Sequence, residues 1–222
     1  MSEFSVKEKF EFKIREVWAN QNYIDIDVIK RGFSVQDIIK KNSIMFVGIN
    51  PSYDQNKIDE NLEFYTVSQI GKSHPYFNKF KEIAANAKHH WTHLDFLFFK
   101  ETNQKYVELL EKSINGPEFI MKQLEISKEI LIEAKPKILI VSNTKARKFT
   151  GFEKNKEQTQ GVWMGFDFQF DDNFGTYKII NNLELENTPV FFTSMLTGQR
   201  AIDNGSFERL KWHINFVIKQ LN

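Results

Sequence analysis

The stretch IMFVGINPSYDQ, residues 44–55, joins an uninterrupted apolar run to a polar turn. The apolar run predicts a strand buried on both faces of a sheet, because neither face carries a polar side chain. The turn that follows contains Asn50, whose amide donates and accepts hydrogen bonds, and Pro51, which fixes the backbone. Asn-Pro commonly opens turns, so this pair serves either a loop alone or an active site in which the amide holds a water or a carbonyl.

Three further apolar runs predict strands at residues 94–99, 137–143 and 189–195. Helical patterns separate them, most clearly at 118–135, where apolar residues recur on one face. This alternation predicts an α/β fold with three layers, α/β/α, around a central, mostly parallel four-stranded sheet. Two β-rich stretches around an Asp-Asp-Asn-Phe-Gly turn, within residues 161–180, predict an extra β-hairpin.

The 222 residues, 41% of them hydrophobic, predict a single domain spanning residues 1–222. Residues 1–42 mix charged and apolar positions, with no Gly or Pro before Gly32, and predict a helical N-terminal extension. The final residues predict a closing helix with Ser206 as its N-cap.

The charges nearly balance, with 30 Lys and Arg against 29 Asp and Glu. Binding of a polyanion would therefore require a local basic patch on the protein surface. The chain has no cysteine, which excludes disulfides and thiolate metal sites and suits a reducing compartment. The N-terminus is charged, and no apolar run reaches the roughly 18 residues of a membrane span. We therefore expect a cytoplasmic monomer with no membrane association.

Ligands bind outside the carboxyl ends of the strands in an open parallel sheet, so the residues that follow each apolar run are the site candidates. They are Gly48, Asn50, Pro51, Ser52, Tyr53 and Asp54 after the first run, Lys100, Glu101, Thr102 and Asn103 after the second, Ser142, Asn143, Thr144, Lys145 and Arg147 after the third, and Ser194, Thr197, Gly198, Gln199 and Arg200 after the fourth.

The GINPS turn resembles the first motif of the uracil-DNA glycosylase superfamily, whose mismatch-specific and single-strand-selective branches carry Gly-Ile/Met-Asn-Pro-Gly. Three later segments resemble that superfamily in the same order: WTHLDFLFFKETNQ (91–104), PKILIVSNTKARKF (136–149) and VFFTSMLTGQRAIDNGSFERLKWHI (190–214). The resemblance covers roughly residues 40–220. It implies an enzyme that extrudes a damaged or deaminated base from DNA and cleaves its N-glycosidic bond without a metal or organic cofactor.

By position, the resemblance makes Asn50 the residue that positions the attacking water. The surrounding loop would contact the base through Gly48, Ile49, Pro51, Ser52 and Tyr53. Asp95 falls near an Asn with which the family reads the base edge, and Phe64 or Tyr65 would supply a stacking ring. A carboxylate at position 95 accepts from a base N–H but cannot donate to a carbonyl, which argues against uracil.

The second motif departs from the family pattern, which has His-Pro-Ser followed by an intercalating side chain. This chain has Thr193, Ser194, Met195 and Leu196, so the His that polarises the leaving base is missing. Ser194 is then the catalytic candidate of this motif, and Met195 or Leu196 could wedge into a base stack. The candidates for DNA backbone contacts are Gln199, Arg200, Lys145 and Arg147.

Two other motifs predict no site. His89 and His93 have the i, i+4 spacing of helical metal ligands, but a third ligand is missing nearby and the segment adjoins a strand. The GKS sequence at 71–73 lacks the upstream glycine of a phosphate-binding loop.

We therefore expect a DNA glycosylase whose partner is single- or double-stranded DNA with a damaged base. The missing His and the acidic residue at position 95 also fit a glycosylase-fold module that binds nucleic acid or a nucleobase without catalysis. A third reading is a hydrolase or transferase acting on a free nucleotide or small molecule, which the near-neutral charge favours slightly.

Overall fold

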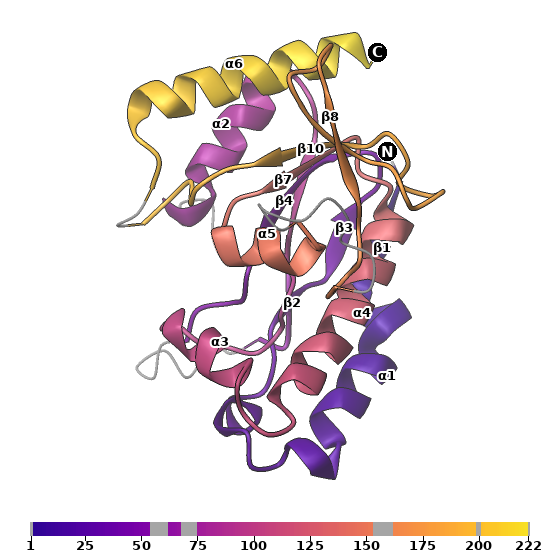
Figure 1. Cartoon of the computed structure of the whole chain (residues 1–222), viewed down its shortest axis with the longest axis vertical. Helices are drawn as coiled ribbons and strands as arrows, with labels where there is room; N and C mark the ends of the chain where they lie inside the picture. The colour runs from indigo at the N-terminus through magenta and orange to yellow at the C-terminus, as the bar shows by residue number, and fades with distance from the viewer. Residues whose placement is uncertain (1, 54–61, 68–74, 153–161, 199–200, 222) are drawn as a thin grey trace.

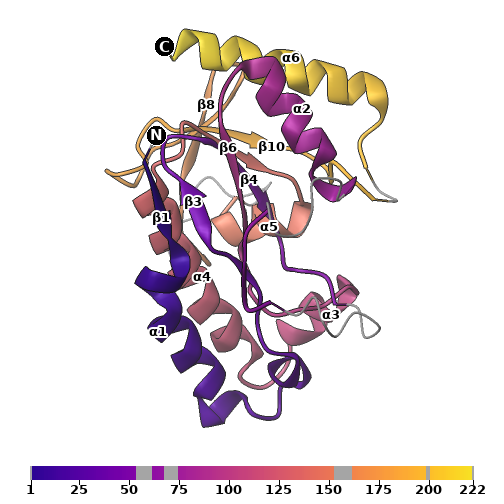
Figure 2. The same cartoon turned by 180° about the vertical axis from the view of Figure 1, so that it is seen from behind.

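The computed structural model describes residues 2–53, 62–67, 75–152, 162–198 and 201–221. Within these ranges the centre is a mixed six-stranded sheet of order β6-β4-β7-β10-β9-β8 (Figures 1 and 2). The parallel strands are β6 (Trp91–Asp95), β4 (Ile44–Gly48), β7 (Ile138–Val141) and β10 (Pro189–Phe192). The predicted α/β class is confirmed.

The hairpin enlarges the sheet beyond the predicted four strands. Its strands β8 (Phe168–Asp171) and β9 (Thr176–Ile179) pair antiparallel with each other, and β9 also pairs antiparallel with β10. The Thr176 Oγ1 donates to the Val190 carbonyl over 2.7 Å, which ties the hairpin to the parallel strands. The prediction of a four-stranded sheet is therefore wrong in strand number, because β10 would otherwise have an unpaired edge that β9 covers.

Strand β4 contributes side chains to two separate cores. Met45 and Val47 belong to the core that includes residues of helices α1 (Val6–Ala19) and α4 (Gly116–Ala134). Ile44 and Phe46 belong to the core that includes residues of α2 (Asn78–Ala87) and α6 (Asn204–Gln220). Successive side chains of a strand point to opposite faces, so helices cover this sheet on both sides (Figures 1 and 2).

The remaining helices are short. Helix α3 (Lys105–Leu110) follows the loop after β6, and α5 (Thr144–Thr150) follows β7 directly. Helix α6 is capped by Asp203, whose side chain accepts from the Ser206 backbone N–H over 2.9 Å, so the predicted cap at Ser206 lies too far along the chain.

The segment 1–42 is helical only in part. After β1 (Glu3–Ser5), Ser5 caps α1 by accepting from the Glu8 backbone N–H. Beyond α1 lie two 3-10 helices, η1 (Gln21–Tyr23) and η2 (Asp27–Arg31), and the strands β2 (Val35–Gln36) and β3 (Ile38–Lys40). Strand β1 pairs with β3, and β2 pairs in parallel with β5 (Phe64–Tyr65).

Strand β6 begins and ends three to four residues earlier than its apolar run predicts, at Trp91 and Asp95 rather than at 94 and 99. Its register is set by β4, with Ile44 opposite Trp91 and Gly48 opposite Asp95. The strand pairing ends at Gly48 and Asp95, and hydrogen bonds between the two loops continue beyond it. The earlier end makes Asp95 the last residue of its strand.

Candidate active site

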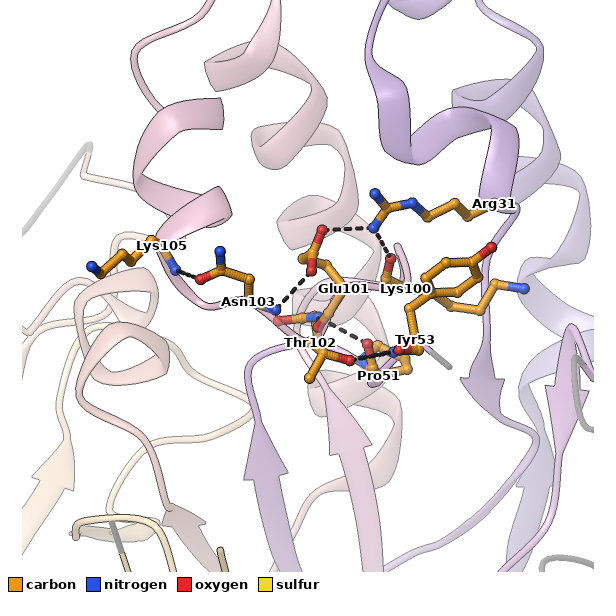
Figure 3. Close-up of polar contacts among 9 residues, drawn as sticks. Arg31, Pro51, Tyr53, Lys100, Glu101, Thr102, Asn103 and Lys105 are labelled. Atoms are coloured by element: carbon orange, nitrogen blue, oxygen red, sulfur yellow. Dashed lines mark hydrogen bonds and ion pairs between the residues drawn. The ribbon is translucent and has the colours of Figure 1, made fainter. Parts of the chain in front are cut away.

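The loops after β4 and β6 remain side by side after leaving the sheet. The Leu97 N–H donates to the Ile49 carbonyl over 2.8 Å, and the Glu101 N–H donates to the Pro51 carbonyl over 2.9 Å. Figure 3 shows the second of these contacts between the two loops. The predicted water-positioning loop is thus held by the segment that follows Asp95, at the carboxyl ends of two neighbouring parallel strands.

The Asn50 side chain connects these two loops. Its Nδ2 donates to the Glu101 carbonyl over 2.6 Å and to the Pro51 carbonyl over 2.9 Å. Among the described residues nothing donates to its Oδ1, and the residue is partly accessible. The amide is therefore fixed through its nitrogen and leaves its oxygen as an acceptor for a water hydrogen.

A second contact holds the same loops farther out. The Thr102 Oγ1 accepts from the Tyr53 N–H over 3.0 Å and donates to the Tyr53 carbonyl over 2.7 Å (Figure 3). Ser52, between these contacts and Asn50, is exposed, whereas Ile49 is buried. Ile49 is therefore a core residue, and its predicted contact with a base would have to come from its backbone.

The outer end of this region contains an ion pair that the sequence analysis missed. Arg31 Nη1 lies 2.6 Å from Glu101 Oε2, and its guanidinium lies 4.8 Å from the Tyr53 ring centroid. Burial alone would raise the pKa of Glu101, but the Asn103 N–H and Arg31 together hold that pKa below its ordinary value. Figure 3 shows Arg31 and Asn103 reaching the Glu101 carboxylate from two sides.

Asp95 lies against Gly48 on the neighbouring strand. A Cβ at position 48 would lie 2.1 Å from Asp95 Oδ1 and 3.3 Å from the Tyr76 hydroxyl, so only glycine leaves room for the carboxyl group. The side chain is 9% exposed, and among the described residues it accepts no hydrogen bond. Burial raises the pKa of Asp95 to about 7.

The neighbour of this carboxyl is His93, two residues earlier on the same face of β6. Its Nε2 lies 3.6 Å from Asp95 Oδ1, and neither ring nitrogen has a hydrogen-bond partner in the described parts of the chain. Burial lowers the pKa of His93 to about 3, so the ring is neutral and does not balance a charge on Asp95. A pKa of about 7 leaves a large fraction of Asp95 protonated at neutral pH, and this neutral carboxyl group donates through its O–H.

Two tyrosines complete the surroundings of Asp95. Burial, followed by the nearby Asp95 charge, raises the pKa of both Tyr65 and Tyr76. Strand β5 alternates, so its other residue, Phe64, instead packs edge-on against Phe33 with ring centroids 5.4 Å apart. Of the two rings predicted to stack on a base, Tyr65 is thus the one close to Asp95. No sequence pattern indicates Tyr76, which lies in a short 3-10 helix directly before α2.

The predicted cations of α5 are engaged within the protein. Lys145 Nζ lies 2.9 Å from Glu108 Oε1 and donates to the Gln104 carbonyl. The Arg147 guanidinium lies 5.6 Å from the Phe152 ring centroid. These side chains would have to release or share their present contacts to bind a DNA phosphate.

The loop after β10 separates the three predicted residues of the second motif. Ser194 is exposed, and in the described structure no hydrogen bond ties it to Asn50 or Asp95. Met195 is half-buried, and its Sδ lies 3.7 Å from Gln104 Nε2, in the loop after β6. Leu196 is only 2% exposed and belongs to the core beside α2 and α6, so it cannot serve as a wedge in this conformation. Gln199 and Arg200 lie outside the described residues.

Replacing Leu196 by alanine is expected to lower the free energy of unfolding by about 2–5 kcal/mol, because it removes a buried side chain from this core. Met195→Ala is the matched variant at the neighbouring, half-buried position, and it should lower the free energy of unfolding by less. Chemical denaturation monitored by circular dichroism measures both. An unchanged unfolding midpoint for Leu196→Ala would show that Leu196 does not belong to the core.

Gly48→Ala is expected to destabilise the protein by about 1–3 kcal/mol, because the added methyl group overlaps the Asp95 carboxyl group. Adding Asp95→Ala removes the overlapping atoms, so the double variant should lose less than the sum of the two single losses. Denaturation curves of the four proteins measure this coupling. Additive losses would show that the two side chains do not compete for this space.

The HHWTH segment does not form a helical metal site. His89 and His90 contact the backbone carbonyls of Asn42 and Lys41, whereas His93 lies inside the protein on β6. In the described ranges no three His, Cys, Asp or Glu side chains are grouped so that they could hold a metal ion. The GKS segment lies outside those ranges.

A hollow of ≈ 470 Å³ lies away from the predicted site. Its lining residues are Asn22, Asp25, Ile26, Asp27, Tyr106, Leu109, Leu110, Ser113, Ile114 and Asn115. None of the residues predicted to act in a site lines it.

Across the described segments, every helix is too short or too polar to cross a lipid bilayer. Comparison of the chain with protein-family models, with curated proteins and with solved structures finds no match.

Proposed function

We propose that this protein is a DNA base-excision glycosylase, which hydrolyses the N-glycosidic bond of a damaged or deaminated base flipped out of DNA. The observation that carries the proposal is the close association of the GINPS loop with the loop that follows Asp95. It brings together, at two neighbouring strand ends, an amide fixed through its nitrogen, whose oxygen accepts from no described residue, and an enclosed carboxyl group. Hydrolysis of a glycosidic bond needs a positioned water on one side and a bound leaving base on the other.

Asn50 takes the first of these roles in the proposed reaction. As the C1′–N bond breaks, the sugar gains positive charge, and a water that donates a hydrogen to Asn50 Oδ1 adds to C1′. Two backbone carbonyls fix Asn50 Nδ2, so the oxygen needs little reorganisation to hold that water. The base leaves with the bonding electrons and is protonated, while the hydroxyl group stays on the sugar.

Asp95 takes the second role and contacts the edge of the flipped base, with Tyr65 beside it. Met195 is the remaining wedge candidate, because it is partly accessible whereas Leu196 is buried. Arg147, which contacts the Phe152 ring, is the better phosphate contact of the two described cations. Lys145 already forms an ion pair with Glu108.

The proposal is tested by incubating excess protein with oligonucleotides that contain one uracil, hypoxanthine or alkylated base, single-stranded and paired. Abasic sites are then revealed by alkaline cleavage. We expect strand breaks at the modified base alone. No product from any of these bases at protein excess would contradict catalysis.

The second candidate is a module of the same fold that binds a nucleobase or nucleic acid without cleaving it. It is favoured by the second motif, where Thr193 and Ser194 replace the His-Pro of the family that the chain resembles. Among the described residues, no hydrogen bond joins Ser194 to Asn50. Binding to the same oligonucleotides without abasic product would support it, and this binding should weaken with salt if phosphates are contacted.

A further inference from the structure

The carboxyl end of β6 contains four titratable side chains in a largely enclosed cluster. They are Asp95 and His93 on β6 itself, Tyr65 on β5, and Tyr76 in the 3-10 helix η4 (Pro75–Phe77). From β4 the cluster is faced by Gly48, which has no side chain. None of these groups is a cation at neutral pH.

His93 is held in place by three aromatic rings, one of which, Tyr76, also lies near Asp95. Its ring centroid lies 5.7 Å from those of Tyr76 and Phe80 and 5.5 Å from that of Phe77. The 3.6 Å gap between His93 Nε2 and Asp95 Oδ1 is longer than a hydrogen bond. Asp95 thus has a fixed neighbour, and within the described parts of the chain no hydrogen bond occupies either of its oxygens.

We propose that Asp95 selects its ligand by its own protonation: the neutral carboxyl binds a ring edge with one N–H and one carbonyl, and the ionised carboxylate binds an edge with two N–H groups. The proposal rests on the proposed function for the identity of the ligand as a nucleobase. It makes Asp95 a specificity-determining residue that accepts both kinds of ring when neutral and only the ring with two adjacent N–H groups when ionised.

The hydrogen-bonding capacity of the carboxyl group explains this change of preference. A neutral carboxyl donates through its O–H and accepts through its carbonyl oxygen, as a side-chain amide does. It therefore matches the N3–H and O4 of a uracil-like ring, and equally the N1–H and O6 of a guanine-like ring. An ionised carboxylate only accepts, so it repels O4 but matches the adjacent N1–H and N2–H of a guanine-like ring.

The proton has to reside on Asp95, because its neighbours do not titrate in the same range. Burial keeps the pKa of His93 at about 3 and raises those of Tyr65 and Tyr76 above their ordinary value. All three are therefore neutral around pH 7, where burial places the pKa of Asp95. A change between pH 6 and pH 8 alters the charge of the cluster at Asp95 alone.

The test measures the binding of 1-methyluracil and 9-methylguanine by NMR chemical-shift titration at pH 6 and pH 8. Neither compound has a glycosidic bond, so binding does not depend on catalysis. With a pKa of about 7, the neutral fraction of Asp95 falls by about tenfold over this range. We expect 1-methyluracil to bind about tenfold more weakly at pH 8 and 9-methylguanine to bind more tightly.

Asp95→Asn is the matched control, because the amide has nearly the same shape and keeps one donor and one acceptor at every pH. We expect it to bind 1-methyluracil equally at pH 6 and pH 8. The His93 ring resonances should shift with a midpoint near pH 7 in the wild type and show no such transition in Asp95→Asn. This readout needs neither a ligand nor activity.

Three results would each overturn the proposal: pH-independent base binding by the wild type, the same pH dependence in Asp95→Asn, or no binding of either base. The excision assay distinguishes its failure from that of the proposed function. If the wild type shows the pH-dependent base preference but excises no base, the proposed glycosylase activity is refuted and the proposed role of Asp95 stands. If the wild type excises a base but its base preference is the same at pH 6 and pH 8, only the proposed role of Asp95 is refuted.

Discussion

Asn50→Ala is expected to lower the rate of base excision by about 100- to 1,000-fold under single-turnover conditions, the range typical for loss of one preorganised polar group. The reason is the loss of Oδ1, the acceptor left available when Nδ2 bonds the Glu101 and Pro51 carbonyls. Product formation with the protein in excess of the oligonucleotide measures the effect. Excision by Asn50→Ala at the wild-type rate would contradict the role of Asn50.

Asn50 also joins the two loops, so a control has to separate loop support from water positioning. Thr102→Val removes the contacts of Thr102 with Tyr53 and leaves the Asn50 amide unchanged. We expect this variant to excise within about tenfold of the wild type, because one neutral, exposed hydrogen-bonding group contributes little. Equal losses in both variants would show that Asn50 acts by holding the loops.

Asp95→Asn is expected to remove a pH-dependent loss of stability. The pKa of Asp95 rises from 3.8 in the unfolded chain to about 7 in the folded protein. Between these values the folded state binds more protons, so the free energy of unfolding falls as pH rises. The Asp95 contribution is complete below pH 4 and is lost as pH rises through 7. From pH 5 to pH 8 the wild type should lose about 3 kcal/mol relative to Asp95→Asn.

The comparison between the two proteins cancels the opposite contribution of His93. The pKa of His93 falls from 6.5 in the unfolded chain to about 3 in the folded protein, so its contribution is present above pH 6.5 and is lost toward pH 3. His93 is unchanged in Asp95→Asn. Urea denaturation of both proteins at pH 5, 6.5 and 8 gives the difference. A constant difference across these values would show that Asp95 has an ordinary pKa in the folded state.

The sequence predicts the central strands because their residues are apolar on both faces. Strands β4, β7 and β10 lie inside the predicted runs, and the residues of β8 and β9 pair as a hairpin. The start of β6 is missed, because Trp91 to His93 gain their strand conformation from pairing with β4 and not from their own hydrophobicity. The second half of the segment 1–42 is missed for the same reason, since β2 depends on β5, far away in the sequence.

The candidate site was only partly marked by the strand ends. Asn50 follows an apolar run, whereas Asp95 lies inside one and is indicated by the resemblance alone; the structure joins the loops that follow them. Arg31 and Glu101 are 70 residues apart, so no local pattern indicates their ion pair. Leu196 was assigned to DNA by its place in a motif, but it fills a gap in the core beside α6. The sequence cannot distinguish these roles, because both need an apolar side chain.

The most direct test of a single site shared by the GINPS loop and Asp95 is a crystal structure with an oligonucleotide that carries 2′-fluoroarabino-uridine, a nucleotide that resists cleavage. We predict that the uracil ring lies within hydrogen-bond distance of the Asp95 carboxyl group, with its C1′ atom on the side of Asn50 Oδ1. A base that remains stacked in the DNA, or that binds in the hollow between residues 22–27 and 106–115, would contradict the account.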